Sequence, residues 1–193
     1  MVVDVEPVAP SEQDKAVAAL VMAFSTDPFL RWMYPEPADY LRHFPAVIHA
    51  FGGEAFRTGF AQQVDSFKGA ALWMAPGIDP GGDELLELFD ATIDPSRLSD
   101  LRAVLDLMDE HHLTAEHWYL PWFGVDAWEQ GRGLGSVLMS ACLTVVDSDH
   151  LPAYLDSTNP RNIAFYRRHG FEVTGHWDAG DSPPIISMLR PAR

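Results

Sequence analysis

A glycine-rich segment in the second half of the chain carries the residues best suited to hold a ligand. It reads Gln130-Gly131-Arg132-Gly133-Leu134-Gly135-Ser136, and it follows an apolar run and opens a helical pattern. Glycines between a strand and a helix let the backbone approach a ligand closely, and the N-terminus of the helix adds partial positive charge. The segment therefore predicts a loop whose backbone N–H groups bind a diphosphate.

The sequence of this loop differs from two better-known phosphate-binding motifs. The dinucleotide fingerprint needs glycine or alanine where Ser136 stands, and the mononucleotide loop needs Lys-Ser or Lys-Thr where Ser136-Val137 follow Gly135. Nucleoside triphosphate binding is therefore disfavoured. The order Q-x-x-G-x-G does fit, and it resembles the acetyl-CoA pyrophosphate loop of the GCN5-related N-acetyltransferases, the GNAT family. A glycine-rich turn without a ligand is the alternative.

A second group of chemically useful residues lies in a short predicted helix further along the chain. Residues 158–160 combine cap-forming side chains with a proline suited to the first helical position, and Gly170 ends the helix. Asn162 and Tyr166 are four residues apart, so an amide and a phenol share one helix face. Such a pair could hydrogen-bond a pantetheine amide and aim a hydroxyl at a thioester sulfur. Taken singly, Asn162 is also typical of a helix surface and Tyr166 of a core.

Two strands and the helix between them must position the glycine-rich loop and the residues that follow it. Residues 117–125 predict a strand despite Pro121, which cannot donate to a ladder and so implies a bulge, an edge or a neighbour that splays away. A helix over 134–147 and a strand over 152–156 follow, and this β-loop-α-β order makes the two strands parallel neighbours. The predicted buried stripe of that helix is Leu134, Leu138, Ala141 and Val145.

The N-terminal half predicts mostly helices around a hairpin. Alternation predicts a first strand over 2–6, including Val2, and residues 60–65 and 69–74 predict an antiparallel hairpin introduced by Gly59. Helical spacing begins at Ser11, the predicted N-cap, and recurs over 40–51 and twice within 83–112. The aromatic segment 29–34 is predicted as core, with the wall of a binding pocket as the alternative.

Composition limits the class of protein. A chain of 193 residues with 47% hydrophobic residues can bury one core, which predicts a single domain over 1–193. No long apolar run or basic leader is present, which predicts a cytoplasmic protein with no membrane partner. The formal charge of −15 argues against nucleic acid as a partner and favours a cationic amine as the substrate.

Single residues give two further predictions. The lone Cys142 is predicted to pack in the core, and the adjacent His111 and His112 predict a helix C-terminus and no metal site.

The C-terminal motifs together strengthen the resemblance to the GNAT family, and the order of their residues is similar to that of puromycin N-acetyltransferase-like members. The matching segments are Gly124-Val125, the loop from Gln130 to Ser136, Leu155-Asp156-Ser157, Asn159-Pro160-Arg161-Asn162, Phe165-Tyr166 and His169-Gly170-Phe171. The resemblance implies an α/β fold (an α+β mixed sheet), in which a central twisted mixed sheet with a splayed strand pair is flanked by helices. It also implies an acceptor-side half over about 1–115 and an acetyl-CoA-binding half over about 116–193.

Residue roles follow from the same resemblance. Acetyl-CoA would be the cosubstrate of a small-molecule primary amine, with Tyr166 as the general acid for the departing thiolate. The implied cofactor-binding residues are Phe123, Val125, Gln130, Gly131, Arg132, Gly133, Leu134, Gly135, Ser136 and Asn162. Basic side chains that could meet the anionic coenzyme are Arg132, Arg161, Arg167 and Arg168.

Several points stay open at the level of sequence. A free amine must lose a proton before attack, and the candidate bases are Asp27, His117, Asp126 and Asp156. The alternatives to a small-molecule enzyme are an acetyltransferase of protein or peptide amines and a non-catalytic acyl-CoA-binding module. Trp122 and the segment 29–34 favour a closed apolar pocket over an open peptide groove. The expected assembly is a monomer or a homodimer.

Overall fold

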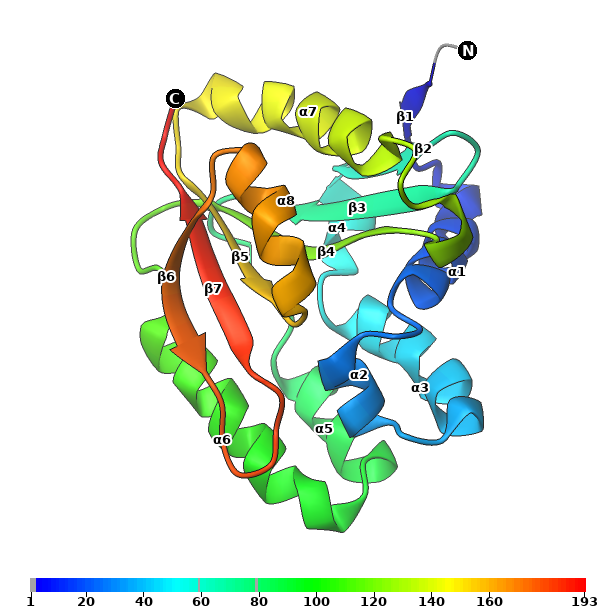
Figure 1. Cartoon of the computed structure of the whole chain (residues 1–193), viewed down its shortest axis with the longest axis vertical. Coiled ribbons are helices and arrows are strands. Elements are labelled where there is room, and N and C mark those ends of the chain that lie inside the picture. Colours follow the sequence, from blue (N-terminus) through cyan, green and yellow to red (C-terminus); the bar gives the residue numbers. More distant parts are fainter. Residues whose placement is uncertain (1–2, 59, 79) are drawn as a thin grey trace.

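A computed structural model describes residues 3–58, 60–78 and 80–193. Seven strands form one mixed sheet in the order β1-β2-β3-β4-β5-β7-β6 within the described chain (Figure 1). Val2 and Gly59 lie outside the described residues. The strands and α-helices are β1 (Val5–Pro7), α1 (Gln13–Ala23), α2 (Pro28–Met33), α3 (Pro37–Ala50), α4 (Glu54–Thr58), β2 (Ala61–Val64), β3 (Gly69–Met74), α5 (Asp83–Thr92), α6 (Pro95–His111), β4 (Trp118–Val125), α7 (Leu134–Val146), β5 (Ala153–Ser157), α8 (Ile163–Arg168), β6 (Glu172–Trp177) and β7 (Ile185–Arg190).

The centre of the sheet opens between β4 and β5. These strands are parallel, as predicted, but they pair only at Trp118↔Ala153 and Tyr119↔Tyr154. Beyond Tyr119 the register between β3 and β4 shifts by one residue, because Met74 pairs with Tyr119 while Leu72 pairs with Trp122. Pro121 lies in this bulge, where no ladder donor is needed. The proline therefore marks both the bulge and the start of the splayed strand pair.

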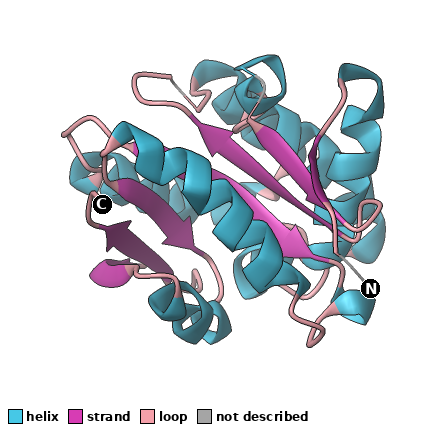
Figure 2. Ribbon diagram, turned by 90° about the horizontal axis from the view of Figure 1, so that it is seen from above, coloured by secondary structure: helices cyan, strands magenta, loops and turns pink. Residues whose placement is uncertain are grey.

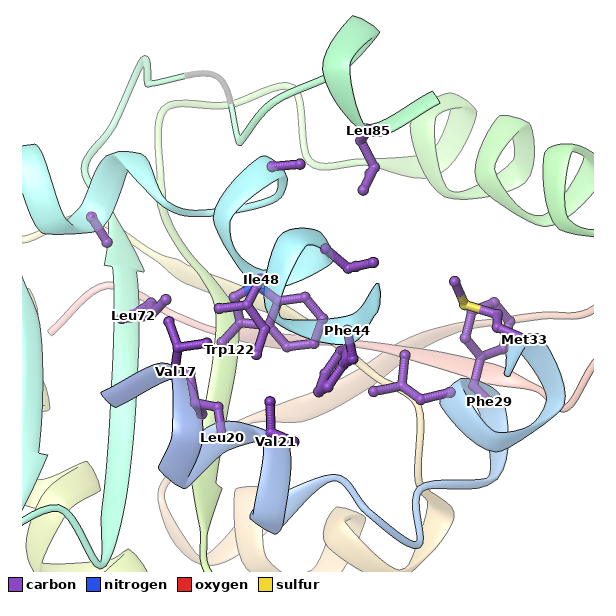
Figure 3. Packing of buried hydrophobic residues seen from close by; sticks show 14 of the residues in the cluster. Val17, Leu20, Val21, Phe29, Met33, Phe44, Ile48, Leu72, Leu85 and Trp122 are labelled. Atoms are coloured by element: carbon purple, nitrogen blue, oxygen red, sulfur yellow. The ribbon is translucent and has the colours of Figure 1, made fainter. Parts of the chain in front are cut away.

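Helices cover both faces of the sheet (Figure 2). The larger core packs α1, α2 and α3 against one face, and Figure 3 shows Leu20, Phe44, Leu72 and Trp122 meeting there. The second core places α7 and α8 against the other face, around residues such as Leu138. Since each face has its own layer of helices, the fold is a mixed α/β sandwich, as expected.

Three local predictions need correction. Ser11 is not a helix cap, because a 3₁₀ turn over Pro10–Glu12 precedes α1 and no side chain caps the helix. The buried stripe of α7 includes Met139, Cys142 and Val146, whereas Val145 is 45% exposed. The face of α7 that meets the sheet is centred near Cys142, which leaves Val145 at its margin. The helix predicted over 160–170 is a 3₁₀ turn over Pro160–Asn162 followed by the shorter α8.

The N-terminal elements agree with most of the remaining predictions. The strands β2 and β3 form the expected antiparallel hairpin, and β1 pairs with β2. Strands β6 and β7 and helix α4 had no sequence prediction. The edge strand β6 is largely exposed, which removes the alternation of apolar residues that would reveal a strand.

Candidate active site

A cleft of about 490 Å³ lies where β4 and β5 separate. It is bounded by the turn between α1 and α2, the C-terminal half of β4, the glycine loop and α8. Of the predicted site residues, the structure brings together Phe123, Val125, Gln130, Gly131, Gly133, Leu134, Gly135, Ser136, Asn162 and Tyr166 in its lining. Arg132 is not part of this lining, although its guanidinium pairs at 2.6 Å with Glu129, which does line the cleft.

The glycine loop has the backbone that its sequence requires. Gly131 and Gly133 have φ values of +76° and +82°, and a Cβ built on either would meet no atom within 4 Å. The side-chain amide of Gln130 donates to the carbonyl oxygen of Val125 at 3.0 Å and closes the loop onto the end of β4. The open space beside positive-φ glycines matches a loop that wraps a ligand.

The first turn of α7 supplies the donors. Gly133 is the N-cap of α7 and makes no side-chain cap hydrogen bond. The first amides of a helix have no intrahelical acceptor, so those at Leu134, Gly135 and Ser136 are free to bind an anion. Diphosphate is the group that this arrangement fits.

An aromatic wall separates the glycine loop from the core. Phe165 stacks on Phe123 with ring centroids 5.4 Å apart, and a Cβ on Gly135 would lie 3.4 Å from Phe165. The small Gly135 therefore allows α8 to approach the start of α7. The sequence analysis quoted Phe165 only as part of a motif; an apolar residue next to the candidate acid was the signal for its position in the wall.

Tyr166 is placed by α8 with its ring against the same wall. Its side chain is 7% exposed, and the rings of Phe165, Phe171 and Phe123 lie 5.3, 5.9 and 6.4 Å away. Burial raises the pKa of Tyr166, and the negative charge of Asp27 raises it further. The phenol is therefore protonated at neutral pH and can act as a proton donor.

Asp27 lies in the turn between α1 and α2 and lines the cleft from the N-terminal half of the chain. Its Oδ1 accepts hydrogen bonds from the amides of Phe29 (3.0 Å) and Leu30 (3.1 Å), which makes it the N-cap of α2. Its Oδ2 accepts the hydroxyl of Thr158 at 2.7 Å. Burial raises the pKa of Asp27 while these hydrogen bonds oppose the rise. The residue thus ties α2 to the loop after β5, across the cleft.

The other candidate bases lie elsewhere in the described structure. Asp156 is enclosed by Ser187 Oγ (2.5 Å) and the Tyr119 hydroxyl (3.3 Å), and burial raises its pKa to about 6. Asp126 caps a 3₁₀ turn through the amide of Trp128, and His117 contacts the ring of His112 at 3.1 Å. None of the three lines the cleft, whereas Asp27 does.

The polar and basic residues of α8 and of the 3₁₀ turn before it line two different cavities. Asn162 ends the 3₁₀ turn before α8 and lines the cleft with Arg161 and Arg168. Arg167 points instead to a different cavity beyond the end of α8. Two of the four predicted basic residues therefore border the cleft.

Trp122 belongs to the core. It is 6% exposed, meets Phe24 and Phe44 edge to face at 5.4 and 5.3 Å, and donates to the carbonyl of Phe51. Phe29 in the segment 29–34 is also buried. The prediction that the segment 29–34 belongs to the core is therefore confirmed, whereas the prediction that Trp122 closes an apolar pocket is wrong, because Trp122 is buried in the core and does not line the cleft.

Among the described residues, no helix is both long and apolar enough to cross a membrane. No three His, Cys, Asp or Glu side chains among the same residues are grouped to hold a metal ion.

Comparison with known proteins relates this fold and cleft to a family of acetyltransferases. Residues 101–171 match the model of the acetyltransferase (GNAT) family. An uncharacterised N-acetyltransferase of Schizosaccharomyces pombe is 27% identical over 182 residues, which cover 81% of this chain and 69% of the relative. A crystal structure from Corynebacterium glutamicum, described as histone acetyltransferase HPA2 and related acetyltransferase, is 28% identical with a TM-score of 0.69 and coverage of 100% and 98%.

A more distant structure shares the fold. The polyamine N-acetyltransferase of Drosophila melanogaster, described as forming N-acetylagmatine, has a TM-score of 0.61 at 14% identity, covering 97% of this chain and 99% of that one. Residues 101–171 of the chain carry the match to the GNAT family, and the comparisons together support an acetyltransferase enzyme. The narrower likeness to puromycin N-acetyltransferase stays a prediction.

Proposed function

We propose that this protein transfers the acetyl group of acetyl-CoA directly to a primary amine of a small molecule. The observation that carries the proposal is the meeting, in one cleft, of the uncapped glycine loop with a buried, protonated tyrosine. Acetyl-CoA supplies the acetyl group as an activated thioester. The chain's part is to bind and orient that molecule and to move two protons.

Binding is assigned to the loop and to α8. Backbone amides over 131–136 hold the diphosphate, and the backbone of Phe123 and Val125 and the amide of Asn162 hold the pantetheine arm along the splayed edge of β4. Both parts of this assignment rest on the lining of the cleft and on the orphan amides of α7. Fixing both ends of a long flexible molecule turns transfer into a reaction between positioned groups.

Proton transfer is assigned to Tyr166 and Asp27. The phenol of Tyr166 gives its proton to the departing sulfur, whose thiol has a pKa near about 8.5. Asp27 accepts the proton of the incoming ammonium, directly or through water, so that the neutral nitrogen can form the new C–N bond as the C–S bond breaks. The second proton, which the nitrogen loses as the amide forms, passes through water to the Tyr166 phenolate and restores the phenol. A carboxylate on the acceptor side also favours a cationic amine.

Substituting Tyr166 tests the acid role. We expect Tyr166→Phe to lower kcat about 100-fold, the usual size of a general-acid effect, and to leave the Kd for acetyl-CoA within about twofold. Steady-state thiol release and calorimetric titration measure the two quantities. Tyr34→Phe is the matched control, because Tyr34 is a buried tyrosine that bonds Thr92 at 2.8 Å and does not line the cleft. An unchanged kcat in Tyr166→Phe would remove the residue from the reaction.

A second candidate is acetylation of protein amines, since the name of the Corynebacterium structure includes a histone acetyltransferase. Thiol release measured with a panel of small amines and with lysine peptides separates the candidates. Higher kcat/KM for small amines supports our proposal, and higher kcat/KM for peptides contradicts it. Tight acetyl-CoA binding without thiol release for any acceptor would instead identify a non-catalytic module.

A further inference from the structure

Asp156 is an enclosed carboxylate without a counter-cation. Its hydrogen bonds come from the neutral hydroxyls of Ser187 (2.5 Å) and Tyr119 (3.3 Å). None of the ion pairs among the described residues includes Asp156, and none includes Asp27. A carboxylate removed from water is costly unless a cation compensates its charge. The chain therefore leaves two enclosed negative charges without a cation of its own.

The hydroxyl of Ser187 is directed at Asp156 by a third residue. The Nε1 of Trp177, which can only donate, donates to Ser187 Oγ at 2.7 Å. The proton of Ser187 is therefore free to point at Asp156 Oδ1. Neutral donors of this kind favour an ionised carboxylate but leave its charge uncompensated. Burial raises the pKa of Asp156 to about 6, so the group is mostly ionised at about pH 7.5.

Asp156 lies where the gap between β4 and β5 begins. Tyr119 and Tyr154 form the last pair that joins these strands. Asp156 follows Tyr154 by two residues, where the two strands no longer pair. It is half-buried, whereas its neighbours are buried more deeply, at 6% exposed for Tyr119, 3% for Tyr154 and 1% for Ser187. The accessible part of Asp156 is therefore on the side from which β4 has diverged.

A short path joins Asp156 to Asp27 in the cleft. Thr158 follows Asp156 by two residues, and its hydroxyl donates to Asp27 Oδ2 at 2.7 Å. Two residues of extended chain span at most about 7 Å. The two carboxylates are therefore separated by a distance on the order of 10 Å, which one small molecule can bridge.

The surroundings of Asp156 suit a cation that carries an alkyl chain. Side chains alternate along a strand, so Asp156 points to the same face of β5 as Tyr154, which belongs to the larger core. On that face, the rings of Phe51 and Tyr154 lie 6.0 and 6.2 Å from the ring of Tyr119. Aromatic rings pack against alkyl groups and attract cations through their faces.

We propose that Asp156 determines the substrate class by binding a second positive charge of the acceptor, so that the preferred acceptors are diamines. One nitrogen lies at Asp27, loses its proton there and is acetylated. The other nitrogen lies at Asp156, stays an ammonium and forms charge-assisted hydrogen bonds with the carboxylate. This inference rests on the proposed function, because Asp27 and Tyr166 must carry out the transfer.

Acceptor kinetics with matched substrates test the inference. Thiol release is measured for a series of linear alkylamines and for the diamines of the same chain length, and kcat/KM is compared per reactive nitrogen. We expect the best diamine to exceed its monoamine about tenfold or more, the effect of roughly one charge-assisted hydrogen bond. In Asp156→Asn this preference should fall to about twofold or less, with kcat/KM for the monoamine within about threefold of the wild type.

Asp149→Asn is the matched control for a lost carboxylate. Asp149 is exposed, accepts a hydrogen bond from Trp118 Nε1 at 3.0 Å and does not line the cleft. This variant should keep the preference for diamines. In Asp156→Asn, an equal loss of kcat/KM for monoamines and diamines would show a purely structural role and overturn the inference, as would a preference that survives.

The wild type alone also tests the inference, whether or not Asp156→Asn folds. Equal kcat/KM for monoamines and diamines would overturn the role of Asp156, while thiol release with the monoamines would leave the proposed function intact. Absence of thiol release with every amine would refute the proposed function as well.

Discussion

Asp27 shows how one residue can join local structure to a candidate reaction. Its Oδ1 caps α2, a contribution of about 1 kcal/mol for such caps, while its Oδ2 holds Thr158 across the cleft. Its charge also raises the pKa of the Tyr166 phenol. An Asp-Pro pair before a helix is detectable in sequence as a cap. Its position opposite Tyr166 is not, because 131 residues separate Asp27 from Thr158.

The substitution Asp27→Asn keeps a side chain that can cap α2 and removes the negative charge. We expect Asp27→Asn to lower kcat/KM for the amine about 10- to 100-fold and to change the free energy of unfolding little, because asparagine caps helices as well as aspartate. Amine kinetics and urea denaturation measure both. Asp94→Asn is the control: Asp94 caps α6 through the amide of Ser96 (2.9 Å) and lies outside the cleft. Equal kinetics in the two variants would contradict the role of Asp27.

At the scale of elements, the junction of β4, the glycine loop and α7 creates the candidate binding site. The strand, loop and helix were predicted from sequence in their order and type, because apolar periodicity and glycine spacing are local signals. The bulge at Pro121 was one of three alternatives that sequence left open. The neighbouring strands decide among these alternatives. The pairing of β4 with β3 shows the extra residue of the bulge, and the short pairing of β4 with β5 shows that these two strands diverge.

A single added methyl group tests the loop. We expect Gly133→Ala to lower the free energy of unfolding by about 1–2 kcal/mol, because φ is +82° at this position. The added methyl group should also weaken coenzyme A binding about tenfold or more, because it enters the space beside the loop that the diphosphate would occupy. Gly77→Ala is matched in conformation, with φ at +77° and nothing within 4 Å of its Cβ, and lies outside the cleft. It should lose similar stability in thermal unfolding but keep its affinity. Similar losses of affinity in both variants would contradict diphosphate binding by the glycine loop.

At the scale of the whole molecule, a buried polar network links the two halves of the sheet. Asp156 on β5 accepts hydrogen bonds from Tyr119 on β4 and Ser187 on β7, and Trp177 on β6 donates to Ser187 Oγ at 2.7 Å. Burial raises the pKa of Asp156 from 3.8 to about 6. The folded protein therefore holds this proton more tightly than the unfolded chain does.

The sign of the resulting pH dependence follows from linkage. The stabilisation is fully present below about pH 4 and is lost as pH rises through about 6, an effect on the order of 2–3 kcal/mol. We expect the free energy of unfolding of the wild type, relative to Asp156→Asn, to fall between pH 4 and pH 7.5. Urea denaturation of both proteins at several pH values measures this difference. A constant or rising difference would show that Asp156 is not destabilised by burial.

The sequence by itself determined the local features: a glycine-rich turn of the kind that suits a diphosphate, Asn162 and Tyr166 four residues apart at the start of and within a helical segment, and the order of the elements around them. Each of these signals arises from neighbours in the chain. Tertiary structure alone decided which of the four candidate bases borders the cleft, that Trp122 is core, and that Arg168 lines a second, basic cavity as well. Those outcomes depend on strand register, on the divergence of β4 from β5 and on how α8 packs, and each brings together segments far apart in the chain.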